Sequence, residues 1–202
     1  MARKQSINVF GKADHNVTIY LLLGQLIIHW ANNESLFLRI LHGLVGTTMK
    51  DASTLFHSHK NTMGRLDLIL ALGNGKIADA PLKVELASLV SKFKGLSRTR
   101  NFFAHAMFNY DEELRIVDAS GVTFDNKNQV FTNELRRFTP ATINEINDAN
   151  TKAVELNRDL WKFAMKLDTH FGREPEMPQQ VPSQLLDELR EPQSPPSTQI
   201  GE

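Results

Sequence analysis

Apolar residues recur every three or four positions over four long stretches of this sequence, and no other feature constrains its fold as strongly. The stretches cover residues 19–44, 49–72, 82–107 and 143–171. This spacing places apolar side chains on one face of an α-helix. Amphipathic helices joined by short connections bury such faces most simply against one another. The sequence therefore predicts an all-α fold, a bundle of four to five helices.

Signals for helix starts and stops divide these stretches. The second helix is expected to be continuous over residues 49–72 and to stop at Gly73-Asn74-Gly75, because glycine favours the backbone conformation that follows a helix end. Asp79, two residues before a proline, is expected to cap the third helix, and Thr139-Pro140 is expected to open the fourth. The fourth helix is expected to end at Gly172.

Between the third and fourth long helices the apolar period changes. Residues 114–117, 122–124 and 129–131 are rich in β-branched and aromatic side chains, and Gly121 is expected to form a turn among them. The sequence therefore predicts a small β-hairpin excursion of two or three strands at this point.

Residues 172–202 differ in composition from the rest of the chain. They hold six of the eight prolines, together with six acidic and two basic side chains, which gives a net charge of −4. Such a segment buries too little apolar area to offset its chain entropy. We therefore divide the chain into a helical domain, 1–171, and a Pro-rich acidic tail, 172–202, that we expect to be disordered. Within the tail, the leucines of residues 183–190 suggest a short amphipathic helix that docks on a partner.

Several kinds of catalytic site have no support in the sequence. There is no cysteine, so disulfides, thiolate zinc sites and a cysteine nucleophile are excluded. Gly73-Asn74-Gly75-Lys76 fails as a phosphate loop, because Ile77 follows the lysine and no strand precedes the glycines. His57 and His59 point to different sides of a helix, which disfavours a metal pair. No serine-hydrolase elbow or dinucleotide-binding fingerprint is present, and we expect neither a metal nor a cofactor.

The sequence also bears on location and charge. Residues 1–12 lack the apolar run of a secretory signal, and the most apolar stretch, 19–30, is interrupted by Gln25 and His29 and is too short to cross a bilayer. We therefore expect a cytoplasmic protein with no membrane partner. The 23 basic and 23 acidic residues cancel, so a nucleic-acid site would require a local basic patch.

Such a patch is predicted around the end of the third helix. The residues concerned are Lys92, Lys94, Arg98, Arg100, Asn101 and His105. Arg100 is the unusual member, because it falls on the apolar stripe of its helix and a core-facing arginine needs an anionic or carbonyl partner. Two alternatives follow. Arg100 either forms a structural ion pair with Glu34, the charged residue on the stripe of the first helix, or holds a phosphate.

Helical geometry separates the residues of this patch. Asn101 and His105 are four residues apart and share a face, whereas Arg100 lies about 140° around the helix from His105. Either the guanidinium reaches round the helix or a second copy of the chain completes the site. Histidine exchanges protons near neutral pH, and arginine can neutralise a phosphate in its transition state. Together these groups suit metal-free RNA cleavage, in which the substrate's own 2′-hydroxyl attacks the adjacent phosphate.

The segment Arg100-Asn101-Phe102-Phe103-Ala104-His105 resembles the signature of the HEPN superfamily (higher eukaryotes and prokaryotes nucleotide-binding domains), which has an arginine, a polar residue, a short spacer and a histidine late in a bundle helix. The resemblance implies a homodimer whose motif helices face each other across a composite cleft. It also implies a metal-independent endoribonuclease in a toxin-antitoxin, phage-defence or RNA-processing setting, with an antitoxin or regulatory protein as a further partner.

Carried over by position, Arg100 would contact the scissile phosphate, His105 would act as general acid or base, and Asn101 would orient them. Arg98 is expected to assist RNA binding, and Glu34 is expected to support Arg100. Some members of the superfamily are not catalytic. The alternative function is therefore a noncatalytic module that dimerises or binds a nucleotide or a protein partner.

Overall fold

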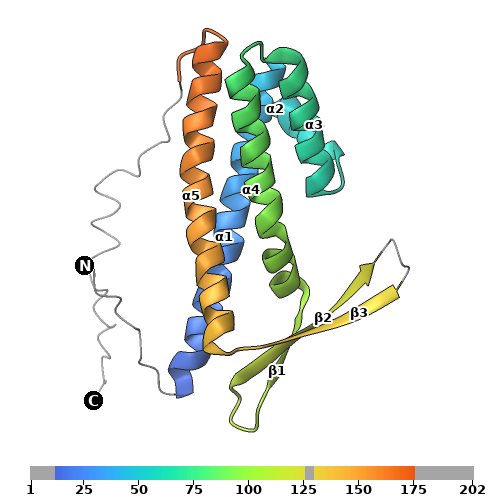
Figure 1. Cartoon of the computed structure of the whole chain (residues 1–202), viewed down its shortest axis with the longest axis vertical. Helices are drawn as coiled ribbons and strands as arrows, with labels where there is room; N and C mark the ends of the chain where they lie inside the picture. Colours follow the sequence, from blue (N-terminus) through green and yellow to red (C-terminus); the bar gives the residue numbers. More distant parts are fainter. Residues whose placement is uncertain (1–11, 126–129, 176–202) are drawn as a thin grey trace, which may run out of the picture.

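Five helices and a small antiparallel sheet make up the described part of this protein. The computed structural model describes residues 12–125 and 130–175. The elements, in chain order, are α1 (Lys12–Val45), α2 (Met49–Ser58), α3 (Thr62–Lys76), α4 (Ala80–His105), β1 (Met107–Tyr110), β2 (Ile116–Asp125), β3 (Val130–Arg137) and α5 (Pro140–His170). Helices α1, α4 and α5 run along the long axis, α2 and α3 lie beside one end of them, and the sheet lies at the other end (Figure 1). The predicted helical bundle is confirmed at this level.

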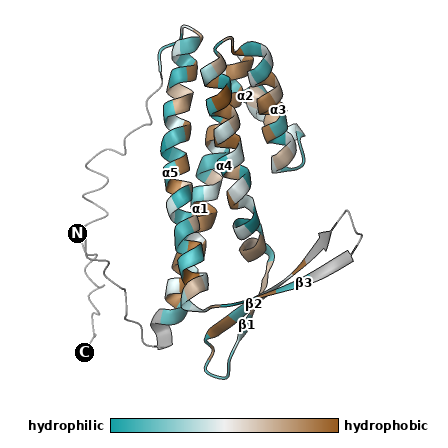
Figure 2. Ribbon diagram, in the orientation of Figure 1, coloured by the Kyte–Doolittle hydropathy of each residue, from teal (hydrophilic) through white to brown (hydrophobic). Residues whose placement is uncertain are grey.

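Helices α1 and α5 form the centre of the bundle and run parallel to each other. Asn33 Nδ2 donates to the Ala153 carbonyl at 2.9 Å, and further along both helices Arg39 forms an ion pair with Asp168 at 2.9 Å. Asn150 is buried among apolar side chains, and its Nδ2 donates to the Leu22 carbonyl at 2.9 Å. Hydrophobic and hydrophilic segments alternate along α4 and α5, as expected of amphipathic helices (Figure 2).

The predicted second helix is two helices, and this prediction was wrong. Helix α2 ends at Ser58, and α3 begins at Thr62. Asn61 causes the restart, because its Oδ1 accepts the backbone N–H of Gly64 at 2.8 Å and so caps α3. The helix that carries the arginine and the histidine is consequently the fourth of the five described helices.

The glycines of Gly73-Asn74-Gly75 do not stop α3, which continues to Lys76. Gly73 is buried against α4, and a Cβ at that position would lie 2.4 Å from Cδ2 of Leu86. The glycine therefore allows the two helices to approach closely. The other predicted boundaries agree better with the structure. The Thr139 hydroxyl caps α5, Gly172 follows its end with φ +69°, and α4 begins after Asp79, although no side-chain hydrogen bond caps it.

The sheet is larger than the predicted hairpin and has three strands in the order β1-β2-β3, all antiparallel. Gly121 is not a turn residue, because β2 runs through it and it pairs with Glu134 on β3. The ring of Phe102 on α4 lies against Gly121, where a Cβ would be 3.0 Å from Cε2. This close contact joins the end of α4 to the sheet.

None of the described helices is long and apolar enough to span a bilayer. Most of the predicted tail, from residue 176 onward, lies outside the described residues, as does the short helix predicted at 183–190.

Candidate active site at the end of helix α4

Helix α4 ends at His105, and the chain passes through the extended residue Ala106 directly into β1. Phe102 and Phe103 anchor this end of the helix, because both are buried and their rings meet edge to face at 5.0 Å. The guanidinium of Arg136, on β3, lies 4.5 Å from the ring of Phe102 and also pairs with Glu134 and Glu145. The two phenylalanines of the motif are thus core residues that fix the polar residues around them.

Arg100 is half-buried and lies over an aromatic ring. Its guanidinium carbon is 5.1 Å from the ring centroid of Trp30 on α1, and its Nη1 donates to Asn101 Oδ1 at 2.9 Å. Its Nε is buried and has no hydrogen-bond partner among the described residues. Within residues 12–125 and 130–175, Arg100 forms no ion pair with a carboxylate. One donor of this cation therefore lacks a partner.

Glu34 does not support Arg100, which corrects one of the two expected alternatives. Its Oε1 accepts from Arg65 Nη1 at 2.7 Å and from Thr62 Oγ1 at 3.1 Å. The restart of the chain at Asn61 explains this, because it places the first turn of α3 beside Glu34. Arg65 is held further by the ring of Phe56, whose centroid is 4.9 Å from the guanidinium carbon. The sequence offered no signal for this pair, because Arg65 does not interrupt an apolar stripe.

His105 and Asn101 are both exposed at the end of α4. They lie four residues apart and share a helical face, as expected. His105 makes no hydrogen bond within the part of the chain that the structure describes. The hydrogen bond between Arg100 and Asn101 connects the two faces, so Asn101 is placed to orient the guanidinium.

The basic patch is smaller than predicted. Lys92 pairs with Asp159 at 2.7 Å, and Lys94 pairs with Asp67 at 2.9 Å, so both lysines are neutralised by neighbouring helices. Arg98 is exposed and forms no ion pair with any described residue. Of the cations in the predicted patch, Arg98 and Arg100 are therefore the two that form no ion pair among the described residues.

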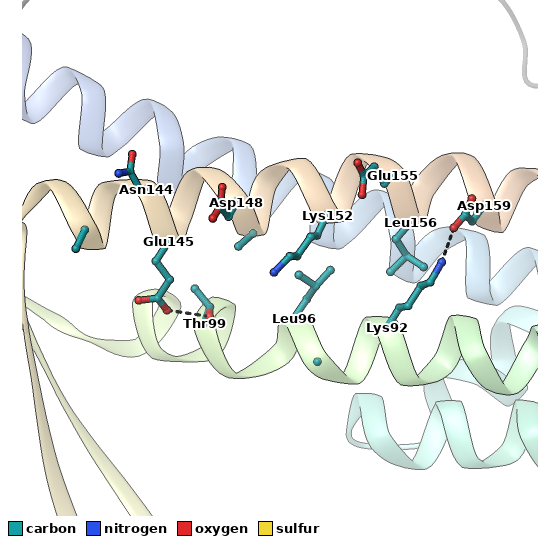
Figure 3. A pocket seen from close by; sticks show the side chains of 13 residues that line it. Lys92, Leu96, Thr99, Asn144, Glu145, Asp148, Lys152, Glu155, Leu156 and Asp159 are labelled. Carbon is teal, nitrogen blue, oxygen red and sulfur yellow. Dashed lines mark hydrogen bonds and ion pairs between the residues drawn. The ribbon is translucent and has the colours of Figure 1, made fainter. Parts of the chain in front are cut away.

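A groove that the sequence did not reveal lies between α4 and α5, with a volume of about 770 Å³. Its charged side chains are four carboxylates and two lysines: Glu145, Asp148, Glu155, Asp159, Lys92 and Lys152. Figure 3 shows Lys92 bonded to Asp159 and Thr99 bonded to Glu145 across the groove. Thr99 faces the groove, whereas Arg100, the next residue, faces α1. The excess of carboxylates makes the groove a poor site for phosphate.

The structure thus brings Arg100 and Asn101 into contact, leaves His105 and Arg98 exposed nearby, and separates Glu34 from all of them. Among residues 12–125 and 130–175, no three histidine, aspartate or glutamate side chains are grouped as metal ligands would be. Comparison of the chain with protein-family models, with curated proteins and with solved structures finds no match.

Proposed function

We propose that this protein is a metal-independent endoribonuclease of the HEPN type that cleaves RNA through its own 2′-hydroxyl. The observation that carries the proposal is the environment of Arg100, a half-buried cation that has no carboxylate partner among the described residues and precedes the exposed His105 by five residues on the same helix. A guanidinium that no carboxylate neutralises is available to a phosphate, which would contact its Nη atoms because the Nε is buried.

The chemistry assigns a role to each side chain. One His105 imidazole takes the proton of the 2′-hydroxyl as its oxygen attacks the phosphorus, and the bond from phosphorus to the 5′-oxygen breaks. The products are a 2′,3′-cyclic phosphate and a 5′-hydroxyl, whose oxygen receives a proton from a second, protonated imidazole. Arg100 neutralises the charge that develops on the phosphate oxygens, and Asn101 orients it. Arg98 assists RNA binding.

A composite site in a homodimer fits this chemistry. Arg100 faces α1, whereas His105 lies on another face of the same helix, and the reaction uses two imidazoles. Two motif helices from two chains supply both arginines and both histidines to one cleft. In this proposal the protein is a cytoplasmic toxin or phage-defence effector, held in check by an antitoxin or regulatory protein.

The test is cleavage of single-stranded RNA by the purified full chain in EDTA. We expect His105→Ala to lower the rate by about 10²- to 10⁴-fold, since general acid–base groups contribute that much. Arg100→Ala is expected to lower it by about 10²- to 10³-fold. His57→Ala is the matched control, because His57 is exposed on α2, remote in the sequence from the motif, and should leave the rate unchanged. Full activity in the His105→Ala protein would disprove the proton-transfer role.

A second candidate function is a noncatalytic dimerisation module, and one observation favours it. Five large apolar side chains of α1 are exposed by 40% to 61%: Val17, Tyr20, Leu21, Ile27 and Ile28. We call these five residues the α1 face. A helix in an isolated soluble domain rarely exposes so many. Absence of RNA cleavage in a protein that dimerises would favour this second function.

A further inference from the structure

The residues of the α1 face lie on one side of the helix, away from the core. Tyr20 and Leu21 lie three and four residues after Val17, and Ile27 and Ile28 lie seven residues after Tyr20 and Leu21, which is the spacing of a single helical face. The buried residues of the same part of α1, among them Leu22, Leu26 and Trp30, lie on the opposite side and contact α4 and α5. The apolar side chains of the α1 face therefore take no part in the core of the chain.

The α1 face is uncovered because α2 and α3 reach only part of α1. The first turn of α3 meets α1 at Glu34, through Arg65 and Thr62. All five residues of the face precede Glu34 in the sequence. Figure 1 shows α2 and α3 beside the end of the bundle opposite the sheet. The half of α1 nearer the sheet has no second layer of helix on this side.

We propose that the α1 face binds the α1 face of a second copy of this chain. From their exposed fractions, the five side chains present on the order of 500 Å² of apolar surface, the size of the largest apolar patch on many monomers, which is often a functional surface. A twofold contact covers this surface on both chains, about 1,000 Å² in total, which is near the smallest area of a specific interface. A larger partner is not needed to explain an apolar face of this size.

The composition of the α1 face suits pairing with itself. No charged residue lies between Val17 and Ala31, so two copies meet without repulsion between like charges. Gly24 lies in the middle of the face, and a Cβ there would meet nothing within 4 Å inside the chain. The packing of the monomer therefore does not require this glycine, whereas two crossing helices approach most closely at a residue without a side chain.

The α1 face also reaches the strand that follows the candidate active site. Tyr20 forms a hydrogen bond of 3.3 Å with the hydroxyl of Tyr110 on β1, the strand that follows His105. A copy bound at the α1 face therefore lies next to β1. The interface itself does not depend on the proposed function. Only the further step, that this second copy completes the cleavage site, rests on it.

The experiment is a measurement of molar mass by light scattering or sedimentation for the full chain. We expect a dimer for the wild type, and a monomer for Leu21→Glu and for Ile28→Glu, because each places repelling charges in the centre of the contact. Val84→Glu is the matched control, since Val84 is 70% exposed on α4 outside the α1 face, and this variant should remain dimeric. Circular dichroism checks that each variant stays helical.

The outcomes separate the interface from the enzymatic activity. A wild type that is monomeric at about 100 µM, or glutamate variants that keep the dimer mass, would overturn the inference whether or not RNA is cleaved. A dimer that depends on Leu21 and Ile28 but cleaves no RNA would support the interface and count against the proposed function.

Mixing tests whether the second copy completes the site. Equal amounts of the wild-type and His105→Ala proteins should give about half the rate of the wild type alone, because half of the wild-type chains are then in mixed dimers that hold only one of the two imidazoles. Adding Ile28→Glu to the His105→Ala protein should remove this inhibition. If the His105→Ala protein does not inhibit the wild type, the two chains do not share the site in this way.

Discussion

In the proposed function, Arg100 must be held within the protein and still be able to bind an anion. An aromatic ring and an amide oxygen offset less of its desolvation than a carboxylate would. The ring of Trp30 and the Oδ1 of Asn101 supply those two contacts, and the buried Nε has no partner among the described residues. A phosphate that reaches Arg100 therefore gains a charge-assisted hydrogen bond without displacing a carboxylate.

Glu34 provides a test of stability that is separate from function. Its ion pair with Arg65 is largely shielded from solvent, with exposed side-chain fractions of 23% and 17%. We expect Glu34→Gln to lower the free energy of unfolding by about 1 to 3 kcal/mol, between the values for exposed and buried pairs, as measured by urea denaturation. RNA cleavage should not change, because Glu34 does not contact Arg100.

The control for this prediction is Glu112→Gln. Glu112 is exposed in the turn before β2 and forms no ion pair within the described residues. Its substitution should therefore leave the midpoint of urea denaturation unchanged. If Glu34→Gln abolished cleavage while the protein stayed folded, Glu34 would have the role in supporting Arg100 that its contacts do not indicate.

At the scale of helices and strands, an element could be predicted from the sequence where its apolar stripe and its capping residues indicate the same bounds. Thr139 caps α5 close to the first apolar residue of that helix, and α1 (Lys12–Val45) contains the whole apolar stripe predicted at residues 19–44. The break between α2 and α3 could not be found in this way, because the apolar spacing continues across residues 59–61. A local hydrogen bond from Asn61 decides it. The partner of Glu34 was missed for the same reason, since Arg65 reaches Glu34 only when α3 starts anew.

The contact between α3 and α4 allows a matched comparison of two glycines in one helix. Gly73→Ala should destabilise the protein by about 1 to 2 kcal/mol, because overpacking against Leu86 outweighs the better helix propensity of alanine. Gly75→Ala should be neutral or stabilising by up to about 1 kcal/mol, since a Cβ at Gly75 meets nothing within 4 Å. Thermal melts of both variants check this. Equal melting temperatures would mean that Leu86 moves aside freely.

Across the whole molecule, the net charge of zero does not describe how the charged side chains are distributed among the helices. The neutral sum conceals a groove between α4 and α5 in which carboxylates exceed lysines, while Arg98 and Arg100 lie outside this groove. Lys92 and Lys94, which the sequence placed with these arginines, are bound to Asp159 and Asp67 instead. The three-dimensional pairing of charges therefore leaves fewer cations for RNA than the sequence suggests.

Because only Arg98 and Arg100 of the predicted patch are unpaired, we expect RNA binding to depend weakly on the salt concentration. For single-stranded RNA, the logarithm of the binding constant falls with the logarithm of the salt concentration by about 0.7 for each phosphate neutralised. Arg98 and Arg100 of one chain give a slope of about −1.4, and a dimer that uses both pairs gives about −2.8.

The slope can be measured by titrating labelled RNA with the His105→Ala protein, which should not cleave it. Arg98→Ala in that background should reduce the magnitude of the dimer's slope by about 1.4, because both copies lose a contact. A slope steeper than about −5 would mean that basic side chains far from the end of α4 hold the RNA, and the proposed site would then be in the wrong place.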